Sequence, residues 1–167
     1  MSNQTILLVG FVGLKASLDI LQNNQEELST RFPISFLQQT KNLDSLLLKL
    51  DDIKGMVNSE TRIYPLGSGG VYTTLWQVCH ELQIGHMVDV SQIPIRQETV
   101  EICEYYRLNP YCIDSEGSYL VFSHNPEELV KQLEEQNIKV AIIGETNNTK
   151  RKEIKRGDEI CSLPRMK

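Results

Sequence analysis

The sequence predicts a mixed α/β fold, in which helices pack against a mixed β-sheet and a helical N-terminal extension comes first. From Thr61 onward, short apolar runs alternate with segments whose apolar residues recur at helical spacing. Two of the apolar runs flank a Ser-Glu-Gly turn, which is typical of a hairpin. The 167 residues are 40% hydrophobic and 23% charged, an ordinary globular composition. We expect residues 1–58 and 59–167 to form one compact unit.

The first 58 residues are predicted to hold one strand followed by helices. Four consecutive aliphatic residues near the start indicate a buried strand, and the leucines that follow recur near a spacing of 3.6 residues. A proline suits the first position of a helix, and Asn or Asp suits the cap. The expected elements are a strand over 5–9 and helices over 14–31, from Pro33, and from Asn42 or Asp44 to about Met56.

From residue 61 the order strand, helix, strand, helix, hairpin, helix, strand, strand is predicted. Val71, Leu75 and Val78 mark one helix face, and Gly85 is placed to end that helix. Asn125 and the proline after it have the sequence of a helix start. The expected strands are 62–64, 86–90, 111–114, 118–123, 139–144 and an edge strand over 152–155, and the expected helices are 71–82, 97–108 and 126–137.

Composition excludes several classes of function. The net charge of −5 and the sequence pI near 5.2 argue against a nucleic-acid binder held by phosphate contacts. No apolar run approaches the ~20 residues that span a bilayer, and the start has no secretory signal. The four cysteines include no CxxC pair. We therefore expect a reduced, cytoplasmic chain without nucleic-acid or membrane partners.

The most informative local feature is the turn Gly67-Ser68-Gly69-Gly70, which precedes a predicted helix. Free backbone N–H groups at a helix start, with no Cβ atoms in the way, can cradle a phosphate or carboxylate. In the alternative interpretation Ser68 is only an N-cap and the glycines serve a tight turn. A helix terminus contributes about 0.3–1 kcal/mol, whereas 1 mM affinity needs about 4 kcal/mol. The loop alone therefore cannot bind a nucleotide, and no nucleotide-binding fingerprint is present.

Other residues that could carry chemistry are the cysteines and histidines. The set with zinc-ligand chemistry is Cys79, His80, His86, Cys103 and Cys112. Its spacing matches no known ligand pattern, so no metal site is predicted. Cys79 and Cys103 fall on apolar helix faces, where cysteine is usually inert. Catalytic residues stay unassigned.

Several motifs together resemble one family. The most specific lies within residues 93–111, and the others are Gly69-Gly70-Val71-Tyr72-x-x-Leu75-Trp76, Val88-Asp89-Val90, Ser118-Tyr119-Leu120-Val121 and Ile142-Ile143-Gly144. Over residues 67–144 they resemble the C-terminal domain of the aminoimidazole ribonucleotide (AIR) synthase superfamily, in particular its hydrogenase-maturation branch, which dehydrates a carbamoyl group to cyanide. Residues 10–14 resemble the end of the domain that precedes it.

The resemblance implies a two-domain enzyme whose N-terminal domain binds ATP and supplies most catalytic acids. This chain has no room for that domain, so ATP and Mg are expected only if a partner supplies it. The family loop usually reads Asp-x-(Ser/Thr)-x-Gly-Gly, but here Pro65 stands in place of the carboxylate and Gly67 in place of the hydroxyl. Cys161 is not at the terminal position of the dehydratase cysteine, so the cyanide chemistry is not transferred.

Three functions remain open. The first is a stand-alone, catalytically degenerate domain that binds a partner or a small anion through residues 67–70. The second is a subunit of a split ATP-dependent enzyme that completes its site with a separate ATP-binding domain. The third is an enzyme that uses Cys161 as a nucleophile. A domain without its family partner exposes the surface that the partner would cover, which favours a homo-oligomer.

Overall fold

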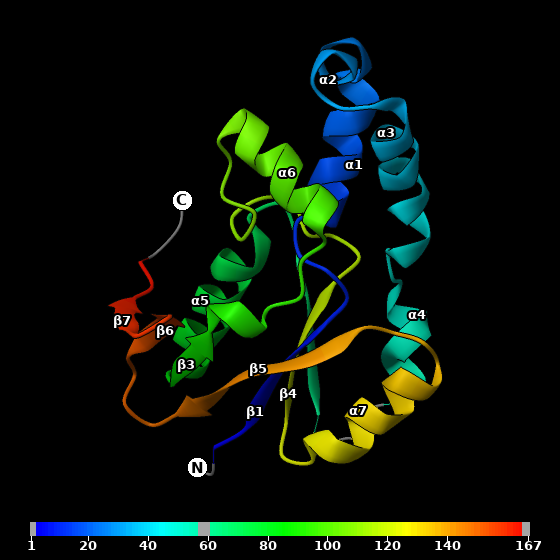
Figure 1. Ribbon diagram of the computed structural model, residues 1–167. Coiled ribbons are helices and arrows are strands. Elements are labelled where there is room, and N and C mark those ends of the chain that lie inside the picture. Colours follow the sequence, from blue (N-terminus) through cyan, green and yellow to red (C-terminus); the bar gives the residue numbers. More distant parts are fainter. Residues whose placement is uncertain (1–2, 57–60, 165–167) are drawn as a thin grey trace.

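The structure is a computed structural model that describes residues 3–56 and 61–164. Its centre is a seven-stranded sheet in the order β2-β4-β1-β5-β3-β6-β7 (Figure 1). Only β3 and β6 pair in parallel, so the sheet is mixed, as predicted. The strands are β1 (Thr5–Val9), β2 (Arg62–Pro65), β3 (Gly85–Asp89), β4 (Tyr119–Ser123), β5 (Val140–Asn147), β6 (Lys152–Arg156) and β7 (Glu159–Ser162).

Helices lie on both faces and at one end of this sheet. The α-helices are α1 (Leu14–Asn23), α2 (Gln25–Arg31), α3 (Ile34–Lys41), α4 (Leu50–Ile53), α5 (Gly70–Leu82), α6 (Gln97–Tyr106) and α7 (Pro126–Glu135). The 3-10 helices are η1 (Asn42–Leu46), η2 (Lys54–Met56) and η3 (Val90–Gln92). Figure 1 shows α1, α2 and α3 standing beside α6, away from the sheet. We call α1, α2 and α3 the helical arm.

Strand β1 lies in the middle of the sheet, between β4 and β5. Its aliphatic run is buried on both faces, which explains why it does not alternate with polar residues. Ile6 and Leu8 join the core under α5, whereas Leu7 and Val9 join the core under α7. The N-terminal strand is thus part of the same sheet as the later strands. The boundary expected at residue 58 lies outside the described residues.

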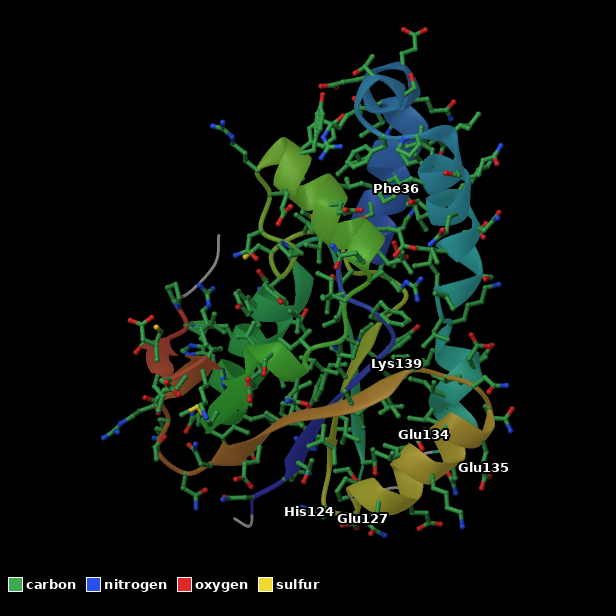
Figure 2. The ribbon with its side chains drawn as sticks, in the orientation of Figure 1. Phe36, His124, Glu127, Glu134, Glu135 and Lys139 are labelled. Carbon is green, nitrogen blue, oxygen red and sulfur yellow. The ribbon has the colours of Figure 1, made fainter. Side chains whose placement is uncertain are left out.

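The helical arm packs on α6 through a third apolar cluster. Leu28 is fully buried, and Phe32 stacks on Phe36 with ring centroids 4.5 Å apart (Figure 2). The hydroxyls of Tyr105 and Tyr106 both donate to the carboxylate of Glu27, at 3.2 and 3.0 Å. These contacts fix the arm to the helix that follows β3 and η3.

Two predicted helices are broken. The helix expected over 14–31 is interrupted at Asn24, whose backbone leaves the helical region and whose amide donates to the Ile20 carbonyl. The helix expected up to Met56 is divided into η1, α4 and η2. Between η1 and α4 the Leu48 N–H bonds the Gly117 carbonyl at 2.9 Å, and the Leu48 side chain packs against the core under α7. Tertiary contacts therefore override the local periodicity.

The predicted hairpin is wrong. Residues 111–114 form turns instead of a strand, and β4 pairs with β1 and β2. The edge strand expected over 152–155 is an inner strand, because β7 pairs with it. Gly85 begins β3 and does not end α5, since Gln83 takes the left-handed conformation there with φ of 56°. An added Cβ on Gly85 would lie 2.6 Å from the Arg151 carbonyl, so close strand approach explains this glycine.

Candidate functional site

The turns that carry the polar residues of interest gather at one end of the sheet. β1 and β2 both run antiparallel to β4, and β5 runs antiparallel to both β1 and β3. One end of the sheet therefore holds the carboxyl ends of β1, β2, β3 and β6 together with the amino ends of β4 and β5. We call it the loop end. In Figure 1 it is the end toward which β1 runs, facing α6 and the helical arm.

The glycine loop Gly67–Gly70 lies at the loop end, between β2 and α5. The Gly67 carbonyl accepts hydrogen bonds from the N–H groups of Gly70 and Ser115, each at 3.1 Å. Gly70 has φ of +76°, and a Cβ there would lie 2.5 Å from the Tyr111 carbonyl oxygen. Only glycine fits this position, because the segment 111–113 passes directly over it.

Part of the hydrogen-bonding capacity of this helix start is already used. The Gly70 N–H bonds within the loop, and the Tyr72 N–H donates to the Tyr111 carbonyl at 3.1 Å. The N-cap of α5 is Gly69 rather than Ser68, and no side chain caps it. Ser68 is exposed. The loop thus offers a ligand the Ser68 hydroxyl and fewer N–H groups than a free helix start does.

Two tyrosines and an arginine lie beside the loop, and sequence reasoning missed this group. Tyr72 and Tyr111 stack with ring centroids 5.3 Å apart, and Arg156 donates to the Tyr72 hydroxyl at 3.3 Å. Burial raises the pKa of Tyr72, and Arg156 partly offsets that effect. Burial also raises the pKa of the nearby Cys112 thiol. No local sequence pattern marks this group, because its members come from a helix, a turn and a strand that are far apart in the chain.

Pro65 is the last residue of β2, pairs with Tyr119 and is exposed. A proline neither ionises nor donates a backbone hydrogen bond. At this position the side chain therefore supplies no acid, base or metal ligand.

The cysteines and histidines do not converge. Burial raises the pKa of Cys79 to about 12 and that of Cys103 to about 11, which keeps both thiols protonated. His86 is fully buried, its Nδ1 lies 3.0 Å from the Glu153 carbonyl, and burial lowers its pKa to about 4. Among residues 3–56 and 61–164 no group of three or more His, Cys, Asp or Glu could hold a metal ion. Cys161 is exposed on β7.

Comparison with solved structures finds the same fold in larger proteins. A HypE–HypF complex matches with a TM-score of 0.69 and 18% identity, over 98% of this chain and 53% of the other. The hydrogenase maturation protein HypE in complex with ATP matches with 0.68 and 17%, over 98% and 51%. Thiamine-monophosphate kinase from Stenotrophomonas maltophilia K279a matches with 0.60 and 15%, over 87% and 48%. The chain thus spans about half the length of these structures.

The sheet, its two helix layers and the glycine loop define a domain of the AIR synthase C-terminal type. The model of the family "AIR synthase related protein, C-terminal domain" matches residues 4–157, and the chain belongs to this family. The match corrects one expectation, because residues 10–14 lie within this domain and not at the end of a preceding one. No curated protein matched. In the described part of the chain, no helix is long and apolar enough to cross a membrane.

Proposed function

We propose that this domain is catalytically degenerate by itself and acts as a binding module, for a protein partner or for a small anion at Gly67, Ser68, Gly69 and Gly70. Pro65 carries this proposal, because it removes the ionisable group from the loop while the glycine turn stays intact. A turn that keeps its backbone shape without its carboxylate can still bind, but it lacks the group that would hold a metal or move a proton.

The loop by itself does not fit Mg-ATP. It offers one hydroxyl and a helix start of which two N–H groups are engaged. A helix terminus contributes about 0.3–1 kcal/mol, and micromolar affinity requires about 8 kcal/mol. Arg156 adds a positive charge nearby, although its guanidinium already bonds Tyr72. Weak binding of a single anionic group is the activity that these residues support.

Calorimetric titration of the purified chain with Mg-ATP, with inorganic phosphate alongside, tests this proposal. We expect no micromolar binding of Mg-ATP and at most weak phosphate binding that is lost in Ser68→Asp. Ser35→Asp is the matched control, since Ser35 is exposed on α3, away from the loop. Robust ATP hydrolysis that Ser68→Ala abolishes would show that the domain is not degenerate.

A second function is favoured by the length comparison. The chain spans 51% of the HypE structure that holds ATP, so a region of about equal size in that protein has no counterpart in the match. In this alternative a separate ATP-binding domain completes the site at the loop end. Purification from the native cell should then recover an ATP-binding subunit with this chain. Repeated recovery without one contradicts the alternative.

We place the chain in the reducing cytoplasm. All four cysteines fall within the described residues and all are free thiols, two of them buried. Free cysteines are usual where glutathione and thioredoxin keep thiols reduced. Cell fractionation tests this placement, and recovery from an oxidising compartment would contradict it.

A further inference from the structure

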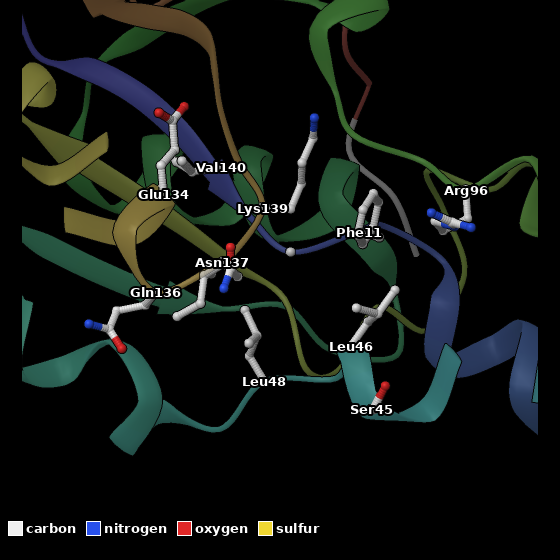
Figure 3. Close-up of a pocket in the computed structure, with 12 residues that line it drawn as sticks. Phe11, Ser45, Leu46, Leu48, Arg96, Glu134, Gln136, Asn137, Lys139 and Val140 are labelled. Atoms are coloured by element: carbon white, nitrogen blue, oxygen red, sulfur yellow. The ribbon is translucent and has the colours of Figure 1, made fainter. Parts of the chain in front are cut away.

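A pocket of about 570 Å³ opens at the loop end, beside the end of α7, and none of the residues Gly67–Gly70 line it (Figure 3). Its size is within the range of small-molecule sites. The turn after β1, the 3-10 helix η1 with the segment after it, and the segment between α7 and β5 enclose it. Phe11, Leu46 and Leu48 give it an apolar wall, whereas Arg96, Lys139 and the residues around Asn137 give it a polar one.

Arg96 is the best-fixed cation of the pocket. Its Nη2 donates to Glu98 at 3.2 Å, and its guanidinium carbon lies 5.7 Å from the centroid of the Phe11 ring. Glu98 is buried and also accepts from Gln39 at 3.0 Å. Burial opposes ionisation of Glu98, but the hydrogen bonds outweigh it and hold its pKa below the usual range. Glu98 therefore acts as a fixed anchor for the guanidinium.

The guanidinium has donors that the protein does not use. The Nε atom of Arg96 is buried and has no hydrogen-bond partner among the described residues. An arginine carries five N–H donors in a planar fork that matches a carboxylate. Glu98 accepts from only one of these nitrogens, so most of the N–H donors of the fork remain available. The Arg96 side chain lines the pocket and is 35% exposed, so a ligand there can reach the edge of the fork that Glu98 does not take.

Lys139 is a second cation of the pocket, and Glu134 limits the ligand's charge. The Lys139 carbonyl accepts from the Gly10 N–H at 2.8 Å, which fixes where the side chain emerges. Lys139 forms no ion pair within the described part of the chain. Figure 3 shows it between Glu134 on one side and Phe11 with Arg96 on the other. The carboxylate of Glu134 disfavours a ligand with several negative charges.

We propose that this pocket binds a small organic carboxylate with an apolar, planar body. Its carboxylate bonds the free edge of the Arg96 guanidinium with Lys139 nearby, and its body lies along Phe11, Leu46 and Leu48. This site uses none of the residues of the glycine loop. This proposal goes beyond the proposed function, and the two are tested independently.

Benzoate is the probe, followed by amide chemical shifts in the isotope-labelled chain. We expect saturable millimolar binding, with shifts centred on Phe11, Ser45 and Lys139. Arg96→Lys keeps the charge but loses the fork, and should weaken binding about tenfold. Lys139→Gln should weaken it several-fold. Ser45→Trp should abolish it by filling the pocket from exposed η1, without any change of charge.

Two control variants locate the site. Lys131→Gln alters an exposed lysine on α7, and Ser68→Asp alters the glycine loop. Both should leave benzoate binding unchanged. Benzyl alcohol, which is neutral, and phenyl phosphate, which carries more charge, should bind more weakly than benzoate.

Four outcomes overturn the proposal. The first is that benzoate shows no saturable binding, and the second is that Arg96→Lys and Ser45→Trp bind it as well as the wild type does. The third is that benzyl alcohol binds as tightly as benzoate, and the fourth is that Ser68→Asp abolishes benzoate binding. The last would move benzoate to the glycine loop and would support the proposed function instead.

Discussion

At the residue scale, Gly67 and Gly70 show that two glycines of one turn have different roles. A Cβ on Gly67 meets nothing within 4 Å, whereas one on Gly70 would meet three backbone atoms of the segment 111–113 within 3 Å. Gly70 also has a positive φ, which residues other than glycine rarely adopt. The sequence does not distinguish the roles of these two glycines, and only the structure shows that they differ.

Gly70→Ala should therefore destabilise the protein strongly. The left-handed backbone alone costs about 1–3 kcal/mol for a residue with a Cβ, and the contact with the Tyr111 carbonyl adds to it. Gly67→Ala should change the free energy of unfolding by no more than about 0.5 kcal/mol. Urea unfolding measures both variants. Equal destabilisation by the two would show that the segment 111–113 does not pass over the loop as described.

His86 makes a second prediction at this scale, on pH. Burial lowers its folded pKa from 6.5 to about 4, so between these values only the unfolded chain binds the proton. The stability contribution of neutral His86 is thus present above pH 6.5 and is lost as the pH falls toward 4. The slope is at most about 1.4 kcal/mol per pH unit.

The test compares His86→Asn with wild type by unfolding across that pH range. The Asn amide can still donate to the Glu153 carbonyl, which His86 Nδ1 contacts in the structure. We expect a flatter dependence of stability on pH in the variant. His124→Asn is the control, since His124 is exposed after β4. Parallel pH curves for His86→Asn and wild type would refute a buried, neutral histidine.

At the element scale, the sequence predicted elements well where one pattern acted alone. The run 5–9, the helix from Val71 and the helix from Pro126 all appear close to their expected bounds, because the apolar residues that predict each element are buried in the fold. Prediction failed where a distant partner decides. Residues 111–114 are apolar enough for a strand, but Tyr111 accepts a hydrogen bond from Tyr72 and the adjacent Ser115 donates one to Gly67, both far earlier in the sequence.

The candidate site divides in the same way. The glycine loop could be predicted from the local sequence, since a run of Gly and Ser residues before a helix is typical of a turn. The neighbourhood of Tyr72, Tyr111 and Arg156 could not, because it joins a helix, a turn and an inner strand. The pocket at Arg96 was equally hidden, since its walls come from four separate segments.

The helical arm makes a prediction at this scale. Leu28 is fully buried between the arm and α6, whereas Ile34 at the start of α3 is 73% exposed. Leu28→Ala should cost about 2–5 kcal/mol, and Ile34→Ala should cost little. Hydrogen exchange should speed up over α1 to α3 in Leu28→Ala while the sheet stays protected. Uniform acceleration over the sheet as well would show that the arm and sheet unfold together.

At the scale of the whole molecule, we expect the domain to self-associate. Ile142 on β5 and Ile160 on β7 are 48% and 57% exposed, and strand pairing places both on the face that carries α7. Large exposed apolar side chains on one sheet face are candidate contacts for another chain. Light scattering over a range of concentrations should show an oligomer that Ile160→Lys weakens and Ile34→Lys does not. A monomer at every concentration would contradict the expectation.

The central place of β1 in the sheet also affects how the chain folds during its synthesis. Gln4 bonds Thr146, 142 positions away, and the two neighbours of β1 in the sheet, β4 and β5, begin only at Tyr119 and Val140. An emerging chain therefore carries a strand with four consecutive aliphatic residues that has no partner until β4 and β5 have left the ribosome. Such distant pairing slows folding and leaves that strand open to aggregation in the meantime. Production of this domain should therefore depend on chaperones that hold β1 until β4 and β5 have been synthesised.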